Sequence, residues 1–128
     1  MCLSVLLSAA AATRSVWDGV YTKAQADRGK DTYGQECLKC HGETLGGGDG
    51  GPALAGDDFL SKWDGKTAGD LFGIMRKAMP PDDPGSLSGR EYSDVLAYIL
   101  SNNDFPAGQK EMDPDVPTLS DIRIERKK

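Results

Sequence analysis

The sequence is poor in the residues that build most metal sites and large cores. Its 128 residues include one histidine and three cysteines, and hydrophobic and aromatic residues make up only 38% and 7% of the chain. No apolar run approaches the ~20 residues of a membrane-spanning helix, because the most apolar stretch covers only residues 1–12. The length suits one domain, and we expect its own side chains to form only a thin core.

The shortage of cysteine and histidine argues against two common uses of a C-x-x-C pair. A structural zinc site takes four Cys or His ligands, but besides Cys37, Cys40 and His41 the chain offers only Cys2, at its extreme N-terminus. A thioredoxin-type dithiol lies in a βαβ pattern, and no Val/Ile-rich run precedes Cys37.

Residues 37–41 have the pattern C-x-x-C-H, which is the attachment signature of a c-type haem. Two thiols on one helical turn form thioethers with the haem vinyl groups, and the adjacent imidazole is thereby placed under the iron. We therefore predict one covalent haem c, attached through Cys37 and Cys40, with His41 as an axial iron ligand. Such a cofactor would complete the thin core.

Met79 is the predicted ligand on the other face of the iron. It precedes two prolines, and a residue before proline is driven from the helical region into an extended one, so its side chain turns off the helix end. Methionine and histidine are the axial pair of cytochromes c. Met75 shares an apolar helical face with Phe72 and is interpreted as pocket lining, whereas Met112 lies in a proline-rich tail.

Charge and the N-terminal segment indicate export. A net charge of −5 and a pI near 4.8 argue against binding to nucleic acid or anionic lipid. Residues 1–12 end in Ala-Ala-Ala and have the apolar composition of a secretory signal, although they lack its basic n-region. We expect a periplasmic protein with no stable membrane insertion after signal cleavage.

Capping signals and periodicity predict an all-α fold with three main helices. Thr22 with Gln25, and Ser88 with Glu91, have the spacing of capping boxes. The predicted helices run from Thr22 toward Cys37, from near Thr67 to Ala78, and from Ser88 to Leu100.

Two further features have simpler interpretations beside the functional ones. Residues 46–51 are glycine-rich but lack the Gly-Lys-Ser/Thr ending of a phosphate-binding loop, so we interpret them as a flexible loop. A buried tryptophan needs a hydrogen-bond partner for its indole N–H, and for Trp63 this partner could be a haem propionate. The alternative is that Trp63 is ordinary core packing.

The chain resembles the small, soluble class I cytochromes c of bacteria over roughly residues 21–100. The resemblance rests on Gly29 and Tyr33 before the C-x-x-C-H motif, on Gly-Pro-Ala-Leu at 51–54, on Met79-Pro80 and on Asp-Val-Leu-Ala-Tyr at 94–98. It implies three helices and loops wrapped around one haem, with Met79 as sixth ligand. It also implies that the Pro52 carbonyl supports His41, and that the first and last helices cross through Gly29, Tyr33, Val95 and Tyr98.

We therefore divide the chain into a predicted signal peptide (1–12), a cytochrome c domain (13–103) and a C-terminal extension (104–128). The extension is either disordered or wrapped around the domain. Phe105, Val116, Leu119 and Ile122 give it apolar side chains to bury, which favours wrapping.

With both axial positions filled, iron changes oxidation state but does not readily bind oxygen or peroxide. We therefore expect a monomeric electron carrier and not an enzyme. Residues 79–88 are similar to those of cytochromes associated with quinoprotein dehydrogenases, so the expected partners are such a dehydrogenase and a terminal oxidase. The alternatives are a relay subunit of a dehydrogenase complex, or a haem enzyme or gas-binding protein if Met79 is not a stable ligand.

Overall fold

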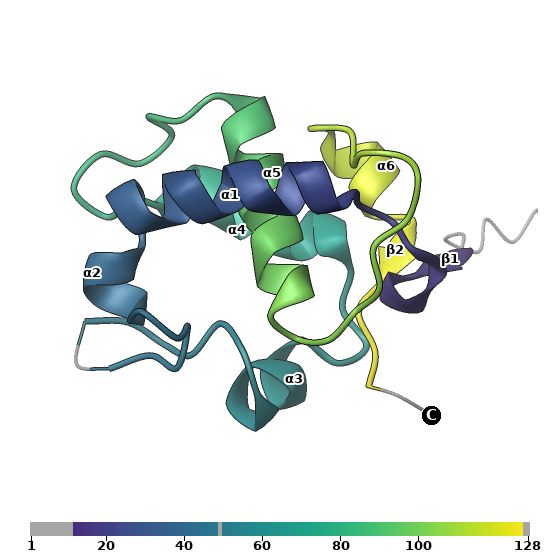
Figure 1. Cartoon of the computed structure of the whole chain (residues 1–128), viewed down its shortest axis with the longest axis horizontal. Coiled ribbons are helices and arrows are strands. Elements are labelled where there is room, and N and C mark those ends of the chain that lie inside the picture. Colours follow the sequence, from purple (N-terminus) through teal and green to yellow (C-terminus); the bar gives the residue numbers. More distant parts are fainter. Residues whose placement is uncertain (1–11, 49, 127–128) are drawn as a thin grey trace, which may run out of the picture.

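The computed structural model describes residues 12–48 and 50–126. The predicted signal segment lies outside the described residues except for Ala12, and Cys2 lies outside them too. The described chain is mostly helical, which confirms the all-α class (Figure 1). Its elements are β1 (Arg14–Ser15), a 3₁₀ turn (Val16–Asp18), α1 (Lys23–Glu36), α2 (Leu38–His41), α3 (Asp57–Trp63), α4 (Ala68–Ala78), α5 (Gly89–Ser101), α6 (Val116–Leu119) and β2 (Ile122–Arg123).

The three predicted main helices are α1, α4 and α5, and a hydroxyl side chain caps each of them. Thr67 before α4 and Ser88 before α5 form complete capping boxes with Asp70 and Glu91. Each box satisfies two backbone N–H groups that the helix itself leaves without acceptors. These local interactions fix where both helices begin.

Only one of the two hydrogen bonds of the capping box predicted at Thr22 and Gln25 is present. Thr22 accepts a hydrogen bond from the Gln25 backbone N–H at 3.1 Å, but the Gln25 side chain does not return to Thr22. It is 1% exposed and bonds instead to the backbone of Met112, whose N–H and carbonyl oxygen lie 2.9 and 3.2 Å from it. Buried backbone groups need partners, and this side chain supplies both.

α1 and α5 cross at Gly29, as predicted. A Cβ at Gly29 would overlap the backbone carbonyl of Asp94, so only glycine lets the two helices approach this closely. Next to the crossing, the rings of Tyr33 and Tyr98 pack with centroids 5.3 Å apart, and Val95 is buried. The crossing fixes the end of α1, which leads into the C-x-x-C-H motif, against α5.

The segment after residue 103 wraps around the helices, as predicted. Phe105 packs edge-on against Trp17, with ring centroids 4.9 Å apart. Leu119 and Ile122 are buried, whereas Val116 is 37% exposed. β2 pairs in parallel with β1, which brings the first and last described segments together (Figure 1). This segment therefore contributes to the same core as the helices.

α3 was not predicted from the sequence. Its N-cap is Gly56, at φ 88°, which makes no side-chain capping hydrogen bond, and the helix is only seven residues long. Phe59 and Trp63 are its buried residues, and they attach it to the core. In the part of the chain that the structure describes, no helix is long and apolar enough to cross a membrane.

Candidate functional site

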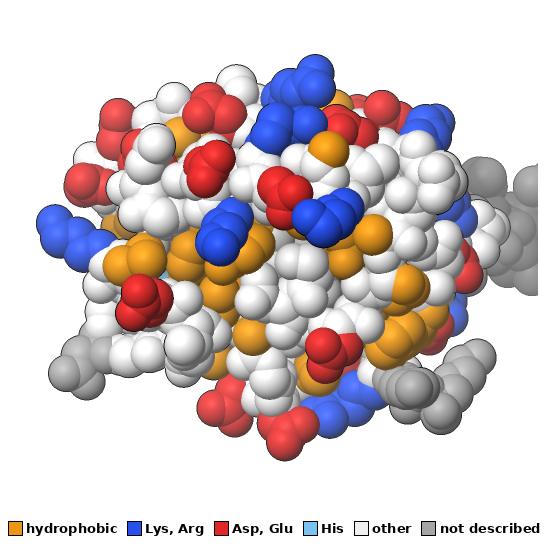
Figure 2. All heavy atoms as spheres, in the orientation of Figure 1, with side chains coloured by type: hydrophobic (Ala, Val, Ile, Leu, Met, Phe, Trp, Pro, Cys, Tyr) orange, Lys and Arg blue, Asp and Glu red, His pale blue; other side chains and the backbone are white. Residues whose placement is uncertain are grey.

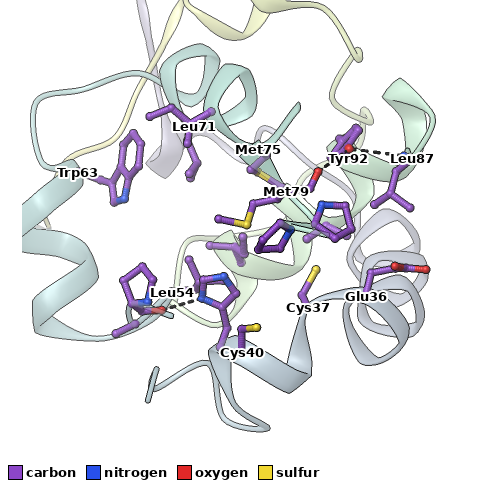
Figure 3. Close-up of a pocket in the computed structure, with 18 of the residues that line it drawn as sticks. Glu36, Cys37, Cys40, Leu54, Trp63, Leu71, Met75, Met79, Leu87 and Tyr92 are labelled. Carbon is purple, nitrogen blue, oxygen red and sulfur yellow. Dashed lines mark hydrogen bonds between the residues drawn. The ribbon is translucent and has the colours of Figure 1, made fainter. Parts of the chain in front are cut away.

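A largely apolar cavity lies among α1, α2, α3, α4, α5 and the loop that follows the glycine run (Figure 3). The empty space inside it is about 930 Å³ when the open solvent at its mouth is counted. Its lining contains all six residues that the sequence singled out for haem binding: Cys37, Cys40, His41, Pro52, Trp63 and Met79.

The C-x-x-C-H motif forms a short helix of its own at the edge of this cavity. Cys37 is the C-cap of α1, its N–H donates to the Tyr33 carbonyl oxygen at 2.9 Å, and α2 begins at the next residue. The N–H groups of Cys40 and His41 donate to the Cys37 carbonyl oxygen at 3.3 and 3.0 Å. One helical turn therefore presents two thiols and an imidazole to the cavity.

The environment of Cys37 argues against thiolate chemistry. Burial, together with Glu36 and Cys40, raises the pKa of the Cys37 thiol to about 11. The thiol is therefore neutral near pH 7, whereas disulfide exchange and metal binding by cysteine both require the thiolate.

The orientation of His41 is fixed by the opposite loop. The side chain is 6% exposed, and its Nδ1 lies 2.7 Å from the carbonyl oxygen of Pro52. A carbonyl oxygen only accepts hydrogen bonds, so Nδ1 carries the proton and Nε2 keeps the lone pair that binds a metal. The contact expected between Pro52 and His41 is therefore present.

The glycine-rich loop before Pro52 packs directly against the motif. A Cβ at Gly50 would lie 3.1 Å from the Cα of Cys40, and one at Gly51 would lie 3.0 Å from Cε1 of His41. Both contacts are tight, so larger residues would push the loop away. These glycines thus bring the Pro52 carbonyl within reach of the imidazole, a role that the sequence alone did not indicate.

Met79 enters the cavity at the C-terminal end of α4. It is the C-cap residue and has an extended backbone, with φ −120° and ψ 145°, as expected before proline. Its N–H donates to the carbonyl oxygen of Met75 at 3.0 Å, and Met75 lines the same cavity. Figure 3 shows both methionine side chains across the cavity from Cys40. The structure thus brings both predicted axial ligands, His41 and Met79, to one cavity.

Trp63 lies 4% exposed at the cavity wall. Trp17 donates its indole N–H to the Glu125 carbonyl oxygen at 2.9 Å, but no described residue accepts a hydrogen bond from the Trp63 indole. Every fully buried polar side-chain atom of the described residues has a partner, so the Trp63 N–H is not fully buried. It is available to an acceptor.

The comparisons with known proteins agree with this geometry. Residues 24–99, more than half of the chain, match the family model described as cytochrome C oxidase, cbb3-type, subunit III. The chain belongs to this family. It therefore has a cytochrome c fold, binds haem c covalently and takes part in haem-based electron transfer. Comparison with curated proteins and with solved structures gave no significant match.

The cavity of this cytochrome c domain fits a haem. Its walls are mostly apolar, as a large hydrophobic ring requires, and apart from His41 the described residues of the lining include only one acidic and one basic side chain, Glu36 and Lys62. Cys37 and Cys40 are unpaired thiols on the same turn as an imidazole whose Nδ1 is already engaged. This donor set supplies what two thioethers and one iron–nitrogen bond require.

Sequence reasoning missed several residues at this site. Glu36 and Lys62 also line the cavity. Each is the neighbour of a residue that the sequence did single out, Cys37 and Trp63, but no sequence pattern indicated that their own side chains would lie there. Leu87 and Tyr92 also line it, and Tyr92 contacts the backbone of Met79. That contact crosses a loop, and the sequence carries no signal for it.

Proposed function

We propose that this protein is a one-electron carrier with one haem c, attached through Cys37 and Cys40 and ligated by His41 and Met79. The observation that carries the proposal is that His41 and Met79, on separate elements, both line one apolar cavity. When bound, the haem supplies an iron that alternates between the ferric and ferrous states, and two protein ligands leave it no open position for a substrate.

The residues around the two ligands suit electron transfer because they hold the ligands still. The Pro52 carbonyl fixes the His41 ring, while α4 and the prolines after it fix the backbone of Met79. Ligands that keep their positions in both oxidation states need little rearrangement when the electron arrives. A thioether ligand also raises the reduction potential relative to two nitrogen ligands.

The surface near the cavity supports transient docking with other redox proteins. Ile74 lines the cavity and is 50% exposed, and Leu38 in the motif is 38% exposed. Figure 2 shows acidic and basic side chains intermingled over one face of the molecule. Small interfaces suit the short-lived encounters of electron-transfer proteins.

The proposed partners are a redox protein as donor and another as acceptor. The family description names a cytochrome c oxidase, which supports a terminal oxidase as acceptor. The likeness of residues 79–88 to cytochromes associated with quinoprotein dehydrogenases supports such a dehydrogenase as donor. We also propose that the protein is a monomer and that it is located in the periplasm. The apolar composition of residues 1–12 supports the location. Mass spectrometry of the exported protein checks cleavage near Ala12.

The ligand assignment is tested by spectroscopy of the purified holoprotein and two matched variants, Met79→Leu and Met75→Leu. Both residues line the cavity, and both changes keep an apolar side chain of similar volume. We expect the oxidised wild type and Met75→Leu to show the thioether-to-iron charge-transfer band and to resist carbon monoxide when reduced. Met79→Leu should lose the band and bind carbon monoxide.

Other results would lead to different functions. Loss of the band in Met75→Leu but not in Met79→Leu would move the sixth ligand to Met75. A wild-type protein that lacks the band and binds carbon monoxide would be a gas-binding protein or a haem enzyme. Stable co-purification with a dehydrogenase would make it a relay subunit of that complex.

A further inference from the structure

The backbone carbonyl of Met79 is held by a side chain from another helix. The Tyr92 hydroxyl donates a hydrogen bond to this carbonyl oxygen at 2.7 Å (Figure 3). Tyr92 is 2% exposed and lines the cavity. The Gly85 N–H approaches the same oxygen at 3.4 Å, which is long for an N–H···O bond. The hydroxyl is therefore the stronger of the two contacts.

Tyr92 is a rigid point from which to hold the loop. It lies in the first turn of α5, which the capping box of Ser88 and Glu91 fixes, and its own N–H donates to the Ser88 carbonyl oxygen at 3.1 Å. The Leu87 N–H also points to its hydroxyl oxygen, at 3.5 Å. One phenol oxygen, acting as both donor and acceptor, thus links the two ends of the loop from Met79 to Leu87.

Met79 needs such a hold because the helix does not supply one. As the C-cap residue of α4 it uses its N–H in the helix, but its carbonyl has no partner in α4 and its φ and ψ are extended. These angles set the direction of the Cα–Cβ bond from which the side chain extends. A contact that fixes the carbonyl therefore also limits how far the side chain swings away from the cavity.

We infer that Tyr92 is a positioning residue that keeps Met79 on the iron by fixing its backbone carbonyl. This inference rests on the proposed ligation by Met79. Its chemical consequence is slower dissociation of the thioether, which keeps the sixth position closed to small ligands in the ferrous state. Tyr92 itself touches neither the iron nor an electron-transfer partner in this role.

The chain offers a matched control for the phenol group. The Tyr21 hydroxyl donates to the Phe105 carbonyl oxygen at 2.6 Å, and Tyr21 is 3% exposed. Like Tyr92 it is a buried tyrosine bonded to a backbone carbonyl, but it does not line the cavity. Tyr21→Phe thus removes an equivalent hydrogen bond without touching the loop that carries Met79.

The test compares wild type, Tyr92→Phe and Tyr21→Phe as holoproteins. For the reduced proteins we measure the rate of carbon monoxide binding, and for the oxidised proteins the temperature at which the charge-transfer band disappears. Loss of one such hydrogen bond should speed carbon monoxide binding in Tyr92→Phe by roughly 2- to 10-fold and lower the temperature of band loss. Amide exchange at Gly85 should also speed up. Tyr21→Phe should match the wild type in all three.

Three results would overturn the inference, and they are distinguishable. If the wild type lacks the band, the ligation by Met79 fails and the inference fails with it. If the wild type has the band but Tyr92→Phe binds carbon monoxide no faster than Tyr21→Phe, only the inference fails. If Tyr92→Phe does not assemble with haem, Gly85→Ala replaces it, because the φ of 78° at Gly85 strains any other residue and loosens the same loop. Unchanged binding in Gly85→Ala then overturns the inference.

Discussion

The side-chain amide of Gln25 pairs with both backbone polar groups of Met112, as a neighbouring strand would. Its amide oxygen accepts from the Met112 N–H at 2.9 Å and its amide nitrogen donates to the Met112 carbonyl at 3.2 Å. Both residues are buried. The C-terminal segment is thus bonded to α1 by two hydrogen bonds that water does not replace.

Gln25→Ala should lower the free energy of unfolding by about 2–4 kcal/mol, because two buried backbone groups lose their partners at once. Chemical denaturation of the holoprotein, followed by far-ultraviolet circular dichroism, measures this change. Gln35→Ala, at an exposed position of the same helix, is the control and should stay within about 0.5 kcal/mol of the wild type. Equal stability of the two variants would show that the pairing with Met112 contributes nothing net.

Two glycines of α1 should respond in opposite ways to alanine. At Gly29 a Cβ meets the Asp94 backbone, whereas at Gly34 nothing lies within 4 Å. Gly29→Ala should therefore cost about 3 kcal/mol or more by forcing the helices apart, and it should reduce the yield of holoprotein. Gly34→Ala should stabilise the helix by about 0.5–1 kcal/mol. Thermal denaturation of both variants measures these changes in stability. A small loss of stability in Gly29→Ala would contradict the close crossing of α1 and α5.

The C-terminal segment should behave as part of the core. Leu119 is fully buried, whereas Val116 in the same short helix is 37% exposed. Leu119→Ala should lower the free energy of unfolding by about 2–5 kcal/mol, and Val116→Ala by less than about 1 kcal/mol. Denaturant titration compares them, and the charge-transfer band should survive both changes. Similar small losses would mean that the segment packs loosely.

Stability should fall on acidification partly through Glu111. A hydrogen bond from Arg28 is the main cause that lowers the pKa of this carboxyl below its ordinary value of 4.5. Arg28 also forms an ion pair with Asp94, and the Arg90 guanidinium lies 3.5 Å from the Glu111 carboxylate. Because the folded-state pKa is depressed, ionised Glu111 stabilises the protein above about pH 4.5, and this stability is lost as pH falls through the folded-state pKa. The carboxyl is 34% exposed, so solvent limits the effect to about 1 kcal/mol or less.

The check on Glu111 is denaturation of wild type and Glu111→Gln between about pH 6 and pH 3. The difference in stability between the two proteins should shrink as the pH falls, and added salt should shrink it at the upper end. Glu43→Gln, at an exposed glutamate, controls for the loss of one carboxylate. A constant difference across the range would contradict the assignment.

The parts of this protein that could be predicted are those whose interactions are local in sequence. The C-x-x-C-H motif lies on one turn, and the caps at Thr67 and Ser88 bond to groups three residues away. The extended backbone of Met79 follows from the proline after it. In each case the determining atoms are close enough along the chain for a pattern of residue types to indicate them.

The contacts that could not be predicted join distant positions or rest on loop geometry. Gln25 and Met112 are 87 residues apart, and the glutamine was interpreted as a capping residue because the local alternative was chemically sound. Tyr92 and Met79 are 13 positions apart, on either side of a loop, and many tyrosines at such a position would only fill space. α3 escaped prediction because Gly56 gives no capping signal.

The parallel pairing of β1 with β2 also determines how the molecule can be tethered. Arg14 lies opposite Ile122, and Thr13 bonds to Asp121 beside them. Figure 1 places this pair at the opposite end of the long axis from α2. A linker attached just before β1 therefore leaves from the end of the molecule away from α2. On an electrode, immobilisation through this linker would present the C-x-x-C-H turn to the solution, so that electrons from the electrode would have to cross the length of the protein.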